Sequence, residues 1–181
     1  MKIKYLQNVL TACSVIMLFS CENSLREVQK ISLSEFSPSG DADDFVLKYT
    51  DSGKIKAILV SPKMLDFAAV QFPFTEFPKG IFLTLYDNKD KKSFIKADFA
   101  TSFKGSDLID LRGNVKISNE LGQNLTTDQL YFDQKNEWFY TEKPFVMVDE
   151  KAGTTAGTGI DFSKDFKVIN YQNVTGAINQ K

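Results

Sequence analysis

Short segments in which apolar and polar residues alternate, separated by turn residues, fill most of this chain. Runs such as FVLKYT, IFLTLY and NVKIS alternate in this way, and the runs are bounded by Gly, Asn, Asp or Lys. After residue 22, apolar residues nowhere keep the 3.6-residue period over three turns that an amphipathic helix shows. Sixteen Phe, six Tyr and one Trp further favour strands. The sequence therefore predicts an all-β domain of many short antiparallel strands.

Turn residues divide these runs into predicted hairpins and loops. FVLKYT and IKAILV should pair around the turn DSGK, and IFLTLY and SFIKADFATSF around DNKDKK. SPSGDADD at 37–44 is expected to be a solvated loop, and 61–80, with three prolines, an irregular edge or corner. Further short strands are predicted at DLIDLRG, NVKISN, NLTTDQLYFD, NEWFYT, PFVMVDE, TTAGTGIDFS, FKVINY and VTGAI.

A weak internal repeat has a period of thirty residues. Residues 97–100 align with 127–130, and 111–115 align with 141–145. Such a period suggests stacked β units, each burying its apolar face on the next. The identities are sparse, so composition alone is an alternative explanation.

The N-terminus has the features of an export signal. Lys2 and Lys4 precede a short apolar stretch that ends at Ser20 and Cys21, and this stretch is shorter than the roughly 20 residues that span a bilayer. Leu18 to Cys21 resembles a bacterial lipobox, which implies cleavage before Cys21 and lipidation of its thiol. The alternative is an uncleaved anchor that ends at Cys21. Both place the body of the protein outside the cytoplasm, and the predicted parts are a leader (1–20), a lipidated tether with a possible first strand at ISLSEF (21–44) and a β domain (45–181).

Composition excludes several function classes. The chain contains no His, and its two cysteines, Cys13 and Cys21, leave none in the body, so a Ser-His triad, a His metal site and thiolate chemistry are absent there. Without residues 1–20 the net charge falls from −1 to −3, which offers no basic field for nucleic acid. Composition does not exclude a glycosidase, which uses a pair of carboxylates, but the acidic residues of this chain show no distinctive spacing. We predict that the protein is no enzyme and needs no cofactor or metal.

The stretch from Asp110 to Asp133 carries a family resemblance. DLRGNVKISN followed by GQNLTTDQLYFD resembles the core of the LptC family, and the hairpin turn DSGK is similar to the one that opens the family's domain. The resemblance covers roughly residues 40–178. It implies a twisted, open antiparallel β-jellyroll that receives lipopolysaccharide from an inner-membrane ABC transporter of the LptB/F/G kind. The domain then passes the lipid to a periplasmic bridge protein similar to LptA, and a lipid anchor holds it at the membrane, with the inner membrane expected.

Site residues follow from strand alternation combined with this resemblance. Inward apolar side chains would form the lipid-binding interior, although plain core is the usual role of such residues. In NLTTDQLYFD, the alternation sets Asp128 on the same side as Leu130 and Phe132. Gly113 is expected to be a structural glycine at a tight strand entry or bulge. Lys89, Lys91 and Lys92 could contact phosphates, but a solvated turn is the simpler interpretation. The candidate interior residues are Val115, Ile117, Leu130, Phe132, Phe145, Met147 and Phe162, and the edge for the downstream partner is Val168, Tyr171, Val174 and Ile178.

Two functions of different class remain. The first is a lipid-transfer component anchored in the membrane. The second is a structural or adaptor lipoprotein that binds protein partners and no lipid. A free carrier of the LptA type is a weaker third, because Cys21 argues for an anchor.

Overall fold

The computed structural model describes residues 37–176, and within them all regular structure is β-strand. The compact unit begins at Pro38. No helix long and apolar enough to cross a bilayer occurs in the described part of the chain. The predicted leader, Cys21, ISLSEF and Ile178 lie outside the described residues. The strands are β1 (Gly40–Asp51), β2 (Lys54–Phe67), β3 (Phe74–Phe77), β4 (Ile81–Tyr86), β5 (Lys92–Ala97), β6 (Phe99–Phe103), β7 (Leu108–Asn119), β8 (Gln123–Asp133), β9 (Trp138–Asp149), β10 (Gly153–Ser163) and β11 (Ile169–Val174).

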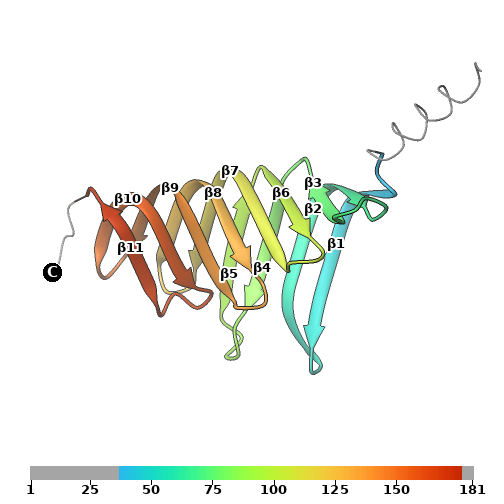
Figure 1. Ribbon diagram of the computed structural model, residues 1–181. Helices are drawn as coiled ribbons and strands as arrows, with labels where there is room; N and C mark the ends of the chain where they lie inside the picture. Colours follow the sequence, from blue (N-terminus) through green and yellow to red (C-terminus); the bar gives the residue numbers. More distant parts are fainter. Residues whose placement is uncertain (1–36, 177–181) are drawn as a thin grey trace, which may run out of the picture. The chain divides into compact units, whose positions relative to one another are not determined.

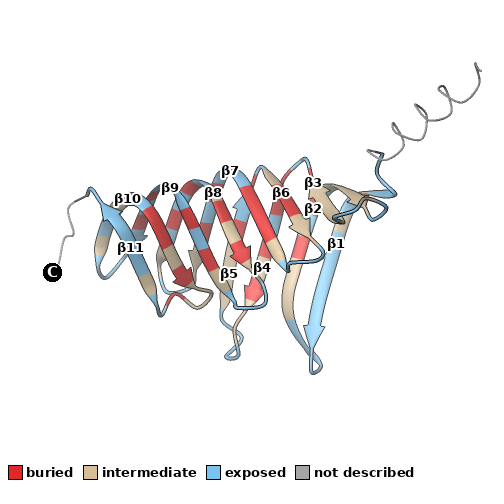
Figure 2. Cartoon of the chain, viewed as in Figure 1, coloured by how far each residue is buried: buried red, intermediate tan, exposed pale blue. Residues whose placement is uncertain are grey.

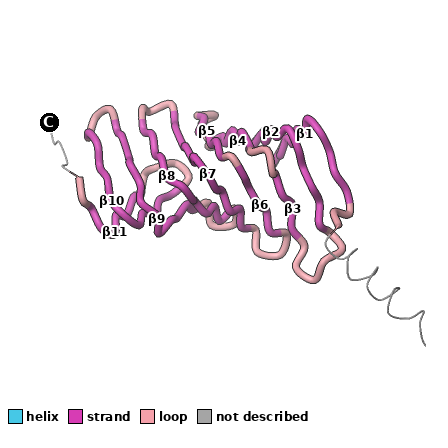
Figure 3. The backbone as a smooth tube through the Cα atoms, turned by 90° about the horizontal axis from the view of Figure 1, so that it is seen from above, coloured by secondary structure: helices cyan, strands magenta, loops and turns pink. Residues whose placement is uncertain are grey.

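The strands form one antiparallel sheet folded over itself, with β1 and β2 at one end and β11 at the other (Figures 1 and 3). Layer A contains β4, β5, residues 45–51 of β1, residues 54–60 of β2, residues 115–119, 123–127, 144–149 and 153–158 of the long strands, and residues 173–174 of β11. Layer B contains β3, β6, residues 65–67 of β2, residues 108–112, 129–133, 138–141 and 160–163 of the long strands, and residues 169–171 of β11. The predicted all-β jellyroll is confirmed.

Each long strand passes from one layer to the other at a bulge. In β7 the register shifts between Arg112 and Val115, where Gly113 and Asn114 have φ of 73° and 46°. An extra residue bends a strand sharply, and a positive φ suits Gly and Asn. DLIDLRG and NVKISN, predicted as two strands, are therefore one bent strand. NEWFYT and PFVMVDE likewise form the single strand β9, so predicting separate strands there was wrong.

The thirty-residue repeat corresponds to real structural units. β7 and β9 begin thirty residues apart, and so do β8 and β10, with the bends at equivalent places. β5 and β6 make a broken version of the same unit, interrupted at Asp98. Each hairpin buries its inner face on the next, and this stacking builds the core.

The N-terminal part of the sheet is more regular than the sequence predicted. GDADD is the start of β1 and not a loop, and β2 continues through Pro62 to Phe67. A proline is tolerated there because the ladder is interrupted at this point: Phe45 pairs with Ser61 and Asp43 with Lys63, while Asp44 has a φ of 51°. Ion pairs from Lys63 to Asp41 and Asp43 hold the two strands together across this irregularity.

Buried side chains run between the layers as a continuous band (Figure 2). The bulge in β8 changes the phase of alternation, so Thr127 is buried and Asp128 is exposed, while Leu130 and Phe132 are again buried. Placing Asp128 on the inner side was therefore wrong. A column of stacked rings occupies the centre of layer B, with centroids 4.3 Å apart for Phe132–Phe139 and 5.2 Å for Phe139–Phe162.

Low pH should destabilise the fold, because it protonates carboxylates that accept hydrogen bonds in the turns. Hydrogen bonds from the backbone and side-chain amides of Asn136 lower the pKa of Asp133, and the N–H of Lys151 does the same for Asp149, helped by Gln123. A folded-state pKa below the unfolded value gives stability that is present above about pH 4 and is lost as pH falls through the lowered pKa. We expect the urea midpoint to fall between pH 6 and pH 3. Asp149→Asn should reduce this pH dependence, and an unchanged dependence would contradict the assignment.

Candidate functional site

An apolar trough opens between the layers at the β1–β2 end of the sheet. Its volume is about 530 Å³. One wall comes from β1, β2 and β4 in layer A, and the other comes from β3, β6, β7 and the β8–β9 turn. The lining residues are Phe45, Leu47, Tyr49, Ala57, Leu59, Thr75, Phe77, Leu83, Leu85, Ser102, Asp107, Ile109, Phe132, Gln134 and Lys135. The lining is therefore apolar in its depth, with polar groups where the layer B turns form the rim.

Alternation along β1 creates the open wall of this trough. Phe45 packs its ring against Phe77 with centroids 6.0 Å apart, and Leu47 and Tyr49 follow on the same side. Leu47 stays 49% exposed and Tyr49 59% exposed, although both face the interior. Such side chains expose apolar surface that could bind an apolar ligand. Sequence reasoning omitted these residues, but the signal was present in FVLKYT, whose first, third and fifth residues are apolar.

Six of the seven predicted interior residues are enclosed in the core, and the seventh, Phe132, borders the trough. Val115, Ile117, Leu130, Phe145, Met147 and Phe162 are each at most 3% exposed and do not line the trough. Phe132 borders the trough and also begins the ring column that leads from it along layer B. Contact of these residues with lipid stays a prediction.

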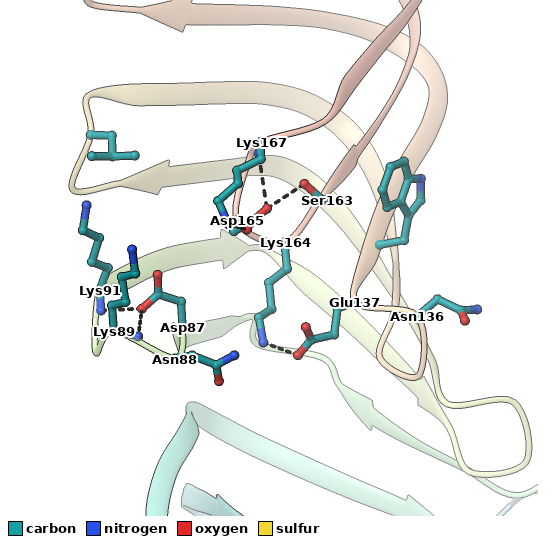
Figure 4. A pocket seen from close by; sticks show the side chains of 12 residues that line it. Asp87, Asn88, Lys89, Lys91, Asn136, Glu137, Ser163, Lys164, Asp165 and Lys167 are labelled. Atoms are coloured by element: carbon teal, nitrogen blue, oxygen red, sulfur yellow. Dashed lines mark hydrogen bonds and ion pairs between the residues drawn. The ribbon is translucent and has the colours of Figure 1, made fainter.

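A polar cleft of about 550 Å³ lies further along the open side of the fold (Figure 4). The β4–β5 turn supplies Lys89 and Lys91, and the loop after β10 supplies Lys164 and Lys167. Three carboxylates accompany these four lysines, and the side chains of the two loops face one another in the figure. The cleft is lined by Asp87, Asn88, Lys89, Lys91, Leu121, Asn136, Glu137, Trp138, Ser163, Lys164, Asp165 and Lys167. Lys89 and Lys91 thus border a cavity, which the simple turn reading did not anticipate.

Each carboxylate of this cleft is held by an ion pair or by backbone hydrogen bonds from a nearby residue. Lys164 pairs with Glu137, and Lys167 pairs with Asp165, whose pKa is lowered by that contact. Burial raises the pKa of Asp87, but the N–H groups of Lys91 and Lys89, at 2.8 and 2.7 Å, outweigh it and leave a net decrease. Lys89 and Lys91 therefore keep their ammonium groups outside any ion pair among the described residues.

The trough and the cleft meet at the β8–β9 turn. Gln134 and Lys135 line the trough, and the next residues, Asn136 and Glu137, line the cleft. The open side of the fold therefore offers an apolar cavity toward β1 and a charged cavity toward β11. This arrangement suits a ligand with an apolar and an anionic part.

The second feature of functional interest is the edge strand β11. It pairs with β10 on one side, and the described residues provide no strand on its other side. Val168 lies in the loop just before β11, and Tyr171 and Val174 lie on it, all at least 39% exposed. One strand covers Ile169–Val174, so the strand predicted at 166–171 was wrong at its start, where Phe166 is a buried turn residue with a positive φ. Residues 175 and 176 of the strand predicted at 174–178 are not strand, and residues 177 and 178 lie outside the described residues. An unpaired edge can accept a strand from another chain.

A single methyl group should loosen this edge. A Cβ on Gly157 would lie 2.2 Å from the carbonyl oxygen of Asn173 on β11 and 3.0 Å from the Phe145 ring. The clash can be relieved only if β11 moves, because the nearest atom belongs to its backbone and not to the end of a flexible side chain. We expect Gly157→Ala to destabilise the fold by about 1–3 kcal/mol and to speed hydrogen exchange in β11. Gly105→Ala, where the added atom meets nothing within 4 Å, is the control. Equal effects would contradict this account.

Asp110 is the one buried charged residue of the described core, and it is structural. Arg112 pairs with its Oδ2, and the Gln129 amide donates to its Oδ1 at 2.9 Å. No group of three potential metal-ligating side chains occurs in the described part of the chain.

Comparison with known proteins agrees with this geometry. A family model described as "Lipopolysaccharide-assembly, LptC-related" matches residues 9–179, which is nearly the whole chain. A search of curated proteins finds no match. The residues that resemble this family, 110–133, form the bent hairpin of β7 and β8 at the centre of the sheet. The chain therefore belongs to the LptC-related family, which takes part in lipopolysaccharide export.

Proposed function

We propose that this protein is a membrane-anchored carrier that holds the acyl chains of lipopolysaccharide in the apolar trough. It receives the lipid from an inner-membrane ABC transporter of the LptB/F/G kind near β1. It passes the lipid to a periplasmic LptA-like partner that docks on β11. Anchoring through a lipid on Cys21 and a periplasmic location belong to the same proposal. The family itself is periplasmic and associated with the inner membrane.

The observation that carries this proposal is the half-exposed apolar wall of the trough. Leu47 and Tyr49 line the trough and yet stay 49% and 59% exposed. The cavity volume of about 530 Å³ is in the range of ligand sites in proteins. Each acyl methylene buried there contributes roughly 0.8 kcal/mol, so a lipid can bind without any reactive group.

The polar cleft suits the other end of the same ligand. Lipopolysaccharide joins acyl chains to an anionic, phosphorylated saccharide. With acyl chains in the trough, this headgroup would extend toward Lys89 and Lys91, whose ammonium groups form no ion pair with the described residues. The adjacency of the two cavities at residues 134–137 supports this orientation.

The alternative function is a structural or adaptor lipoprotein that binds protein partners and no lipid. The edge strand β11 would serve such a role equally well. The trough favours the carrier, because a scaffold gains nothing from leaving Leu47 and Tyr49 uncovered.

In-cell photocrosslinking separates the two functions. A photoreactive residue at Leu47 in the full chain should form a lipopolysaccharide adduct. The matched control is Val148, which is 39% exposed and points outward from β9 in layer A. Leu47 is a better site than Phe132, since replacing a ring in the core column would disturb the fold.

An adduct at Leu47 and none at Val148 is the expected result. If the folded, membrane-associated protein forms no lipid adduct at either Leu47 or Tyr49, the carrier function is wrong and the adaptor function stands. A protein adduct at Leu47 would identify the trough as a partner site.

A further inference from the structure

The outer face of layer A carries two adjacent rows of side chains across the sheet, in which apolar and basic residues predominate. Cross-strand pairing gives the first row, Val46, Val60, Phe82, Lys96 and Lys116. The second row is Lys48, Ile58, Thr84, Phe94 and Ser118. We call these two rows the lysine–aromatic face. All five members of the first row are exposed, and Phe82, at 45%, stacks on Phe94 with centroids 6.0 Å apart.

The charge of this face has one sign. Neither row contains an Asp or Glu, although the whole chain carries a net charge of −1. Lys48, Lys96 and Lys116 form no ion pair among the described residues. Beside the rows, Lys92 lies 5.9 Å from the centroid of the Tyr86 ring. The face is therefore a cationic patch with exposed rings on an overall acidic protein.

The outer face of layer B differs in charge. Its corresponding row runs from Glu76 through Tyr131, Tyr140 and Asp161 to Asn170 and contains no lysine, and the carboxylate of Asp110 in this row is buried and paired with Arg112. Trp138 points to this side and donates to Asp161 at 3.2 Å. The two outer faces therefore give the domain a charge asymmetry across its thickness. In a negative field, such a domain turns layer A toward the source.

We propose that the lysine–aromatic face lies on an anionic phospholipid surface and orients the domain with layer A toward the bilayer. Lysine heads bind lipid phosphates while their stems and nearby aromatic rings contact the acyl boundary, as on interfacial protein surfaces. A protein partner would need a matching acidic surface, whereas a bilayer with anionic lipids offers one everywhere. This inference goes beyond lipid transport and requires no occupant in the trough.

The length of the N-terminal segment permits this contact. About 18 residues separate Cys21 from Gly40, the first residue of β1, and a chain of that length spans at most roughly 60 Å. An anchor at residue 21 can therefore hold the face at the bilayer without strain.

Tryptophan quenching by brominated lipid tests the proposal on the full chain. A Phe82→Trp/Trp138→Phe protein places the only tryptophan on the lysine–aromatic face, and the unaltered protein, with Trp138 alone, reports on the other face. Both are inserted in vesicles of brominated phosphatidylcholine, with or without phosphatidylglycerol. We expect residue 82 to lose about half of its fluorescence in the anionic vesicles, since interfacial contact brings the ring to the acyl boundary. Trp138 should lose little.

Charge variants supply the decisive comparison. Lys96→Glu/Lys116→Glu should abolish the quenching of residue 82, and added salt should weaken it by screening. Lys143→Glu/Lys151→Glu, which makes the same charge change outside the face and outside both cavities, should leave it intact. Equal quenching at the two tryptophan positions, or quenching that survives Lys96→Glu/Lys116→Glu, overturns the proposal. If the face binds an acidic protein and not a bilayer, residue 82 will stay unquenched in vesicles that contain no other protein, and this result also overturns the proposal.

Discussion

Phe139→Ala should lower the free energy of unfolding by about 3–5 kcal/mol, the usual cost of removing a buried ring without filling its space. Phe139 is 1% exposed and stacks between Phe132 and Phe162, so its loss breaks two ring contacts and opens a cavity in the centre of the column. The free energy of unfolding of natural domains is about 5–15 kcal/mol, so the substitution removes a large share of the protein's stability. Urea unfolding of the purified protein, followed by circular dichroism, measures it.

The neighbouring residue is the matched control. Tyr140 lies on the outer face of the same strand and stacks on Tyr131 with centroids 5.1 Å apart. Tyr140→Ala should cost about 0.5–1.5 kcal/mol, the value of an aromatic pair at the surface. If the two substitutions destabilise the protein equally, the ring column is not the centre of the core.

Leu47→Glu should abolish lipid transport while leaving the fold intact. The side chain is 49% exposed in the free protein, so a carboxylate there remains hydrated and the domain stays folded. Acyl chains in the trough would remove that water, and an unpaired carboxylate in an apolar setting costs several kcal/mol, which lowers lipid occupancy more than about tenfold. Lipopolysaccharide reaching the cell surface, in cells that depend on the variant, is the measurement.

Two controls make this result interpretable. Val148→Glu places the same charge on an outward position of comparable exposure and should leave transport unchanged. Leu130→Asp buries a charge at a fully enclosed site and should unfold the protein, which shows what loss of fold looks like in the same assay. Normal transport by a folded Leu47→Glu protein would remove the trough from the lipid path.

Much of the fold could be predicted from local pattern. Alternation in NVKIS sets Val115 and Ile117 on the inner side and Lys116 on the outer side, where the structure has them. The thirty-residue repeat coincides with the spacing of the long hairpins. The family resemblance at 110–133 agrees with the family match over residues 9–179.

Local pattern failed wherever a bulge changed the phase. Asp128 has the right spacing to share a face with Leu130, but one irregular step in β8 turns it outward. Gly113 was expected at a bulge or strand entry, yet the sequence did not show that the strand continues beyond it into the other layer. Strand continuity depends on the partner strands on either side, and a single segment does not encode it.

The candidate site, like the fold, was determined partly by the sequence and partly by the tertiary structure. By itself, the sequence determined that the domain is all-β, that the chain has no His and no Cys after residue 21, and which side of each regular strand is apolar, because these follow from composition and the two-residue period of a strand. Only the tertiary structure decided which apolar residues are enclosed and which line a cavity. Leu130 and Leu47 are alike as residues, yet Leu130 is enclosed between the two layers and Leu47 lines an open trough, because Leu47 lies on β1, which pairs with β2 alone among the described strands.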